Sequence, residues 1–232
     1  MREIVFDTET TGLSPLNGDR IVEIGCVEMF NRCETGRTFH SYFNPGRPMP
    51  SDAEAVHGLS DRFLSDKPSF PDVCEELLAF IGESPMIAHN ANFDFGFINH
   101  ELGACGRPSV CMSRMICTLS LARQKFPGAK HSLDALCTRF GVDRSQRIRH
   151  GALLDAQLLA QVYVELTGGR QIGLSLVAEL IDEGAPGGDP AGNGGAPARI
   201  VRPARPHAPS EAELVRHAAF LAHIKDPIWN RV

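Results

Sequence analysis

The stretch Ile4-Val5-Phe6-Asp7-Thr8-Glu9 decides how this 232-residue chain is interpreted, because it is an apolar strand that carries two acids. Side chains alternate along a strand, so the two acids share one face while Ile4 and Phe6 point to the other. The two carboxylates then lie about 6–7 Å apart along the backbone. Two negative charges at that separation on an interior segment lose hydration and repel each other. Oxygen ligands of this kind suit Mg²⁺ or Mn²⁺, so we interpret the pair as part of a metal site.

The overall composition is that of a soluble globular protein, with 43% hydrophobic and 22% charged residues. No apolar run approaches the ~20 residues that span a bilayer, and Asp7 and Glu9 interrupt the N-terminal apolar stretch where a signal peptide would have its core. The seven cysteines form no C-x-x-C pair, and their odd number argues against a disulfide framework. We therefore expect a cytoplasmic protein with reduced cysteines and no membrane partner.

The net charge of −5 limits how the chain can hold nucleic acid. A protein that binds nucleic acid tightly by itself usually presents a basic surface. Any nucleic-acid substrate must therefore be held by metal ions, by a few local contacts or by partner proteins.

The pattern of the first 170 residues predicts an α/β fold with a mixed five-stranded sheet and flanking helices. Three strands are expected as a meander, with a turn over residues 31–36, followed by two short buried strands; the five are residues 3–8, 21–30, 37–43, 86–88 and 115–117. Helices are expected between and after the short strands, over residues 69–80, 92–102, 119–125, 132–140 and 151–166. Residues 184–209 are rich in Gly, Pro and Ala and predict a flexible tail.

Two further aspartates lie on apolar helix stripes. Asp94 is aligned with Phe97 and Ile98, and Asp155 is aligned with Leu158, Leu159 and Val162. An aspartate in such a position is costly unless it is paired or bound to metal. Helix N-capping for Asp94 and a buried ion pair for Asp155 are the alternatives, while a wet edge strand is the alternative for the first acid pair. Four acids in matching contexts favour the metal site.

His150 precedes the last predicted helix and stands five residues before Asp155. A neutral imidazole beside bound metal can take a proton from water, which hydrolysis of a phosphodiester requires. Just upstream, Arg144, Arg147 and Arg149 form a local basic cluster. These arginines either touch a phosphate backbone or belong to a solvated loop.

Together, Asp7-x-Glu9, Asp94 within H-N-x-x-F-D and His150-x4-Asp155 resemble the DEDD superfamily of 3′–5′ exonucleases, in the subgroup whose third motif carries histidine. Longer runs resemble the epsilon family of proofreading exonucleases of bacterial DNA polymerase III over roughly residues 2–176; they are D-T-E-T-T-G at 7–12, V-H-G at 56–58, S-L-D-A-L-C at 132–137 and H-G-A-L-L-D-A-Q at 150–157.

This resemblance implies a ribonuclease-H-like fold in which two Mg²⁺ or Mn²⁺ ions are held by four acids, Asp7, Glu9, Asp94 and Asp155. It implies that His150 is the general base. It also implies substrate contacts at the DNA 3′ end from Asp7, Glu9 and Asp155 and from three further residues, Thr10, Asp52 and His57. A packing role in a turn is the alternative for His57.

Two segments beyond the catalytic domain predict partners. Gln171-Ile172-Gly173-Leu174-Ser175-Leu176 fits the Q-x-x-L-x-L pattern by which replication proteins bind the sliding clamp, with Gln171, Leu174 and Leu176 as contacts. After the tail, Ser210 and Glu213 fit a capping box before a helix over residues 214–224, whose apolar stripe continues to Ile228 and Trp229. In the resembling family this terminal segment docks on the polymerase alpha subunit. A small third core subunit occurs in part of that family, and nothing in the sequence decides whether it binds here.

The sequence therefore predicts an exonuclease domain over residues 1–169, a clamp-binding segment over 170–177, a flexible linker over 178–209 and a polymerase-binding helix over 210–232. The predicted activity is removal of mispaired 3′ nucleotides as 5′-monophosphates. Two alternatives remain open at this point. One is a free-standing exonuclease that acts on RNA or single-stranded DNA, and the other is an adaptor between polymerase and clamp.

Overall fold

The computed structural model describes residues 1–147, 149–169 and 208–224, and the chain divides into two units, residues 1–177 and 178–232. The predicted clamp contacts Gln171, Leu174 and Leu176 lie outside the described residues, as do Ile228 and Trp229 and almost all of the predicted linker. Within the described ranges, no helix is long and apolar enough to cross a membrane.

The first unit is built on a five-stranded sheet of order β3-β2-β1-β4-β5, and the predicted mixed five-stranded sheet is confirmed. β1 pairs antiparallel with β2, which pairs antiparallel with β3, whereas β4 and β5 continue the sheet in parallel. The strands are β1 Arg2–Thr10, β2 Ile21–Phe30, β3 Cys33–Tyr42, β4 Met86–Ala88 and β5 Met115–Cys117. The strand with the two acids is therefore the central one.

The predicted six-residue turn between β2 and β3 is wrong. The chain reverses over Asn31 and Arg32, both of which have positive φ (49° and 65°), and β3 already begins at Cys33. Two successive residues with positive φ make the tight turn whose twist matches that of paired strands. Gly36, which suggested a turn, lies inside β3 with φ 83°, where the register with β2 shifts. A glycine in that conformation marks a bulge within the strand.

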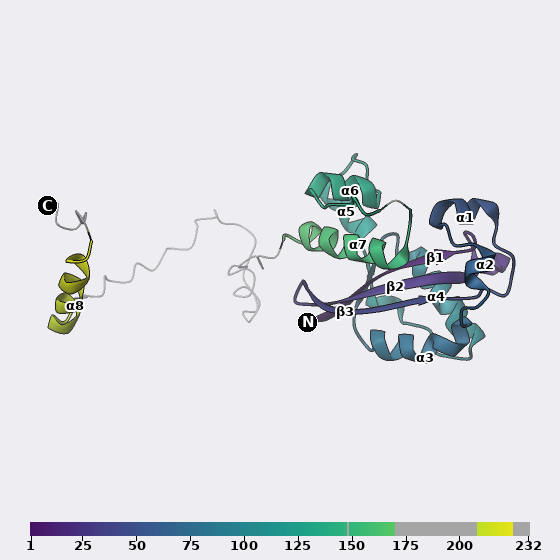
Figure 1. Cartoon of the computed structure of the whole chain (residues 1–232), viewed down its shortest axis with the longest axis horizontal. Coiled ribbons are helices and arrows are strands. Elements are labelled where there is room, and N and C mark those ends of the chain that lie inside the picture. The colour runs from purple at the N-terminus through teal and green to yellow at the C-terminus, as the bar shows by residue number, and fades with distance from the viewer. Residues whose placement is uncertain (148, 170–207, 225–232) are drawn as a thin grey trace, which may run out of the picture. The chain divides into compact units, whose positions relative to one another are not determined.

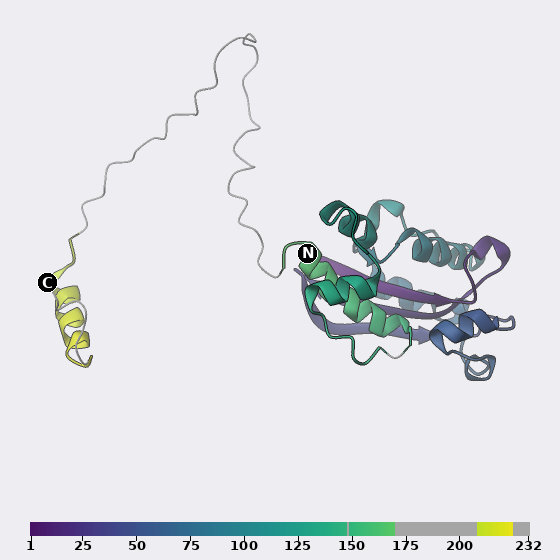
Figure 2. The same ribbon diagram turned by 90° about the horizontal axis from the view of Figure 1, so that it is seen from above.

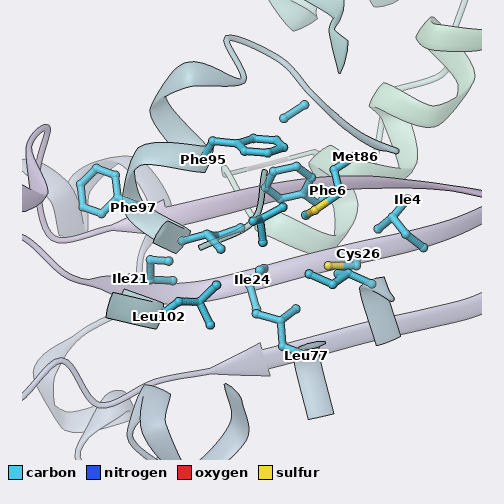
Figure 3. Close-up of a cluster of buried hydrophobic side chains, with 14 of the residues drawn as sticks. Ile4, Phe6, Ile21, Ile24, Cys26, Leu77, Met86, Phe95, Phe97 and Leu102 are labelled. Atoms are coloured by element: carbon cyan, nitrogen blue, oxygen red, sulfur yellow. The ribbon is translucent and has the colours of Figure 1, made fainter. Parts of the chain in front are cut away.

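Helices cover both faces of the sheet, and the two faces have different neighbours (Figure 1). One face packs against α3 (Phe70–Ile81) and α4 (Asn92–Ala104), and the other packs against α7 (Ala152–Leu166). In the view from above, the green helix α7 lies over the purple strands (Figure 2). On the α3 and α4 side, Ile4, Phe6 and Phe95 belong to the larger buried apolar cluster (Figure 3).

The predicted helices are present with small changes of their ends. α5 covers Thr118–Lys125 and α6 covers Leu133–Phe140, and Gly141 ends α6 with a φ of 68°. Two short helices were not predicted, α1 (Ser51–His57) and α2 (Asp61–Leu64). α1 has exposed residues through most of its length, so it lacks the apolar stripe on which the predictions depended. Two short 3₁₀ turns complete this unit, at Pro15–Asn17 and Met112–Arg114.

The described part of the second unit contains α8 (Glu211–Leu221). The predicted capping box is present, because Glu213 N–H donates to the Ser210 hydroxyl and the Glu213 carboxylate accepts from Ser210 N–H. The helix starts three residues earlier than predicted and ends at Leu221 instead of residue 224. Its apolar side chains Leu214, Val215 and Phe220 are exposed.

Candidate active site

Strand β1 places Asp7 and Glu9 on the sheet face that α7 covers. Val5, two residues before Asp7, packs with Ala156, Leu159 and Ala160 of α7, whereas Ile4 and Phe6 pack on the opposite side. Since side chains alternate along the strand, both acids project toward the N-terminal end of α7. The predicted division of β1 into two faces is confirmed.

Asp94 reaches the same place from the first turn of α4. It is 3% exposed, and its Oδ1 accepts a hydrogen bond of 2.7 Å from the Thr8 hydroxyl on β1. The N-cap of α4 is Ala91, so the alternative of helix N-capping by Asp94 is wrong. Burial raises the pKa of Asp94 to about 7, although the hydrogen bond from Thr8 acts in the opposite direction.

Asp155 comes from the first turn of α7, and a glycine on β2 allows the approach of that helix. Gly25 lies opposite Asp7 in the register of β1 and β2. A Cβ atom at Gly25 would overlap the backbone of Ala152 and Leu153. The missing side chain therefore lets the start of α7 rest directly on the sheet, and this contact places Asp155, which is 3% exposed, beside the acids of β1.

The buried ion pair considered for Asp155 is present together with the acid cluster. Arg147 donates from Nε to Asp155 Oδ1 at 2.5 Å and from Nη2 to Asp155 Oδ2 at 2.7 Å. It also donates from Nη1 to Asp134 Oδ1 at 2.9 Å. The alternative of a solvated loop is therefore wrong for Arg147, whose side chain is 9% exposed, whereas a contact of Arg147 with phosphate stays a prediction. Arg144 instead lies at the surface and pairs with Asp134.

His150 stands at the entrance of this acid cluster. Its side chain is 48% exposed, and its Nδ1 lies 3.4 Å from Asp155 Oδ2. One ligand atom from each of Glu9, His150 and Asp155 lies within 4.8 Å of the other two. A cavity of about 540 Å³ is lined by all five main residues of the sequence prediction, Asp7, Glu9, Asp94, His150 and Asp155. The structure therefore brings together the predicted acids and the predicted base.

Burial and neighbouring acids raise the pKa values of Asp7 and Glu9 in this cavity. Burial raises the pKa of Asp7 well above its usual range, and the nearby charges of Asp94, Glu9 and Asp155 add to the effect. Burial and the charge of Asp155 raise the pKa of Glu9 to about 8. Such a cluster is stabilised by cations, and carboxylate oxygens are donors that suit Mg²⁺ or Mn²⁺. The residues present therefore fit divalent metal ions.

The three residues of the second group, Thr10, Asp52 and His57, line an adjoining cavity of about 490 Å³. Thr8, Glu9 and Phe93 line both cavities, which therefore lie side by side at these residues. His57 Nδ1 accepts from Leu59 N–H at 3.0 Å, and burial lowers the pKa of the ring. A neutral His57 therefore carries its proton on Nε2. His57 therefore does pack in a turn, which is the alternative considered for it, and its ring also lines the cavity.

Several residues of the site were missed in the sequence. Thr8 holds Asp94, and Gly25 admits α7, as described above. Glu23 lies opposite Glu9 in the register, is buried, and its Oε1 is 2.7 Å from His40 Nε2. An acid in the second strand of the meander, I-V-E-I-G, was a signal for Glu23, because alternation places it on the same face as Gly25. No comparable signal pointed to the contact between Arg147 and Asp155.

Comparison with known proteins agrees with this geometry. An exonuclease family model matches residues 4–163. The chain is 49% identical over 227 residues to the DNA polymerase III subunit epsilon of Rickettsia felis, and the alignment covers 97% of each chain. It is 48% identical over 177 residues to the subunit of the same name from Salmonella typhimurium, covering 73% of this chain and 72% of that one.

Solved structures share the fold. Exonuclease X in complex with 5′ overhanging duplex DNA matches with a TM-score of 0.58 and 28% identity, covering 71% of this chain and 90% of that one. The nuclease domain of 3′hExo, a DEDDh family member bound to rAMP, matches with a TM-score of 0.62 and 17% identity over the same shares. The chain therefore belongs to the exonuclease family, among the epsilon subunits of DNA polymerase III, and is a 3′–5′ proofreading exonuclease.

Proposed function

We propose that the chain removes mispaired nucleotides from a DNA 3′ end by hydrolysis at two divalent metal ions, releasing nucleoside 5′-monophosphates. The observation that carries this proposal is the convergence of four buried or nearly buried carboxylates from three elements on one cavity; they are Asp7, Glu9, Asp94 and Asp155. Enzymes of this family depend on divalent metals in general. When bound, such ions supply Lewis-acid activation of water and stabilisation of the leaving 3′ oxygen.

The residues of the chain have distinct parts in this mechanism. The four carboxylates would hold the two ions, whose charge would offset the burial and repulsion that raise the pKa values of Asp7 and Glu9. His150, half-exposed at the cavity entrance, takes the proton of the attacking water as general base. The bond that breaks joins phosphorus to the 3′ oxygen of the preceding nucleotide. That oxygen leaves as the new 3′-hydroxyl of the primer.

The adjoining cavity supplies a place for the terminal nucleotide. Its lining is mostly apolar, with Leu13, Val56 and Phe93 available to contact a base. Thr10, Asp52 and His57 offer polar groups, and the Nε2 proton of neutral His57 is a donor for a sugar or phosphate oxygen. We propose that an unpaired 3′ nucleotide occupies this cavity while its phosphate lies at the acids.

A net charge of −5 does not favour binding of DNA by the chain alone, so association with the polymerase core would supply the affinity for the substrate. We propose that α8, with exposed Leu214, Val215 and Phe220, binds the polymerase alpha subunit. The segment of Gln171, Leu174 and Leu176 is proposed to bind the sliding clamp, with residues 178–209 as the linker. Binding through tethered segments raises the effective concentration of the exonuclease at the primer end.

The two alternatives from the sequence have less support. The match to the Rickettsia felis protein covers 97% of this chain and so includes the terminal segments, which a free-standing exonuclease does not require. The adaptor alternative does not require four converging acids and a histidine at their cavity.

The proposal is tested by digestion of a 5′-labelled primer–template that carries one 3′ mismatch, with Mg²⁺ or Mn²⁺. We expect metal-dependent loss of nucleotides from the 3′ end, and a reduction of at least about a hundredfold in His150→Ala, because general-base catalysis contributes on that scale. His100→Ala is a matched control, since His100 is exposed on α4 and outside the cavity lining. Digestion without metal, or full activity of His150→Ala, would contradict the mechanism.

A further inference from the structure

Arg147 occupies both oxygens of a proposed metal ligand. Its Nε and Nη2 atoms donate to Asp155 Oδ1 and Oδ2 at 2.5 and 2.7 Å, which is a two-point pairing of guanidinium with carboxylate. Both side chains are almost fully buried, at 9% and 4% exposure. The hydrogen bonds that Arg147 donates to Asp155, together with the charges of Asp155 and Asp134, raise the pKa of Arg147 above its usual range. The guanidinium is therefore a permanent cation within the acid cluster.

The same guanidinium also restrains the proposed base. Arg147 Nη2 lies 2.8 Å from His150 Nδ1. A guanidinium can only donate, so Nδ1 of His150 must accept in this contact, and the lone pair of that nitrogen is in use. A single side chain thus engages a proposed metal ligand and the proposed base together.

We propose that Arg147 is an internal counter-ion that competes with divalent metal for Asp155, and that metal binding releases Asp155 and His150 in one movement. This inference rests on the proposed function in taking Asp155 as a metal ligand. A divalent cation and a guanidinium at the same two oxygens repel each other, so the two cations compete for the charge of Asp155. Asp134 provides a partner for the displaced side chain, since its Oδ1 already accepts from Arg147 Nη1 at 2.9 Å.

A competing role and a merely structural role of Arg147 predict opposite changes in metal affinity when the side chain is removed. If Arg147 only fixed the loop before α7, its loss would loosen His150 and Asp155 and weaken metal binding. If Arg147 competes with the metal, its loss leaves Asp155 as an uncompensated buried charge, and metal then binds more tightly. Arg144 provides a matched control, because it pairs with the same Asp134 oxygen at 2.8 Å but is not paired with Asp155.

The experiment is calorimetric titration of the full chain with Mn²⁺, for the native protein, Arg147→Gln and Arg144→Gln, with thermal unfolding measured with and without the metal. We expect Arg147→Gln to bind Mn²⁺ at least about tenfold more tightly, because the buried Asp155 carboxylate has then lost its paired cation. Its metal-free Tm falls, and its Tm rise on adding Mn²⁺ exceeds that of the native protein. Arg144→Gln is expected to match the native protein in both measurements.

Equal or weaker Mn²⁺ binding by folded Arg147→Gln overturns the inference while leaving the metal site intact. If Arg147→Gln does not fold without metal, Arg147→Lys decides, because it keeps the charge but cannot form the two-point pairing. It is then expected to bind Mn²⁺ a few-fold more tightly than the native chain, and unchanged binding overturns the inference. Absence of any Mn²⁺ binding by the native chain is a separate result, which contradicts the proposed function itself.

Discussion

The two faces of strand β1 alternate residue by residue, and they affect the free energy of folding in opposite directions. On one face, Ile4 and Phe6 are fully buried, and Phe6 meets Phe95 edge to face with ring centroids 5.7 Å apart. On the other face, Asp7 and Glu9 are brought against further acids that raise their pKa values. The first face supplies folding free energy, and the second consumes part of it to hold charges together. One strand therefore joins an apolar core face to a face that carries a cluster of acids.

The largest expected effect separates activity from stability on the charged face. Asp7→Asn removes one carboxylate from the acid cluster and keeps the shape of the side chain. We expect the exonuclease rate to fall at least about 10³-fold, or ~4 kcal/mol of transition-state stabilisation, because a metal ligand is lost. Metal-free unfolding temperature should stay equal or rise, since a repulsive charge is removed.

The matched change on the apolar face is expected to lower stability and leave activity intact. Phe6→Ala leaves a cavity beside Phe95 and is expected to lower the free energy of unfolding by about 4 kcal/mol, while the remaining folded molecules retain activity. Denaturant unfolding and the rate per folded molecule measure both quantities. Similar losses of stability in Asp7→Asn and Phe6→Ala would show that the two faces do not differ in the way described.

A smaller effect is expected where β2 meets α7. Gly25→Ala places a Cβ atom against the backbone of Ala152 and Leu153, so α7 must move away from the sheet. We expect a loss of about 3 kcal/mol in stability, as for overpacking in a core, together with weaker metal binding because Asp155 moves with the helix. Thermal unfolding and Mn²⁺ titration measure the two effects.

Gly96→Ala is the control for this change. Gly96 is exposed on α4, and a Cβ atom there meets nothing within 4 Å. The substitution should stabilise the protein by about 0.5–1 kcal/mol, because alanine favours the helix. If Gly25→Ala were as harmless as Gly96→Ala, close packing of α7 on the sheet would not be needed to position Asp155.

The last expected effect is a pH dependence of the metal-free protein. The pKa of Glu9 rises from 4.5 to about 8 on folding and that of Asp94 from 3.8 to about 7. The folded state therefore binds more protons than the unfolded state between these values, and stability falls as pH rises through that window. The two groups together predict a loss of about 3–4 kcal/mol between pH 6 and pH 8.

Denaturant unfolding at both pH values measures this loss. Saturating Mn²⁺ should abolish the difference, since bound cations replace protons as the compensating charge. A metal-free stability that rises from pH 6 to pH 8 would contradict the assignment of raised pKa values to these carboxyl groups.

The sequence was most informative where periodicity and chemistry agreed. Alternation in β1 predicted which face Asp7 and Glu9 occupy, and the apolar stripes predicted the helices of Asp94 and Asp155. It was least informative where a side chain acts across the fold. Arg147 lies in an irregular loop, and no period relates such a residue to a buried carboxylate. Gly36 led to the wrong turn prediction because glycine occurs in both turns and bulges. The register of β3 with β2 is needed to tell the two apart.

The hydrogen bond from the Tyr163 hydroxyl to Glu3 Oε1, at 2.8 Å, joins residues that are 160 positions apart. This bond is part of the packing of α7 on β1, so the first strand packs against residues near the C-terminal end of the domain. Closing so long a loop is slow compared with forming local structure. During synthesis on the ribosome, a nascent chain lacks the fourth carboxylate until α7 has emerged. The nuclease is therefore assembled at the end of translation of its domain, and shorter fragments carry an incomplete centre.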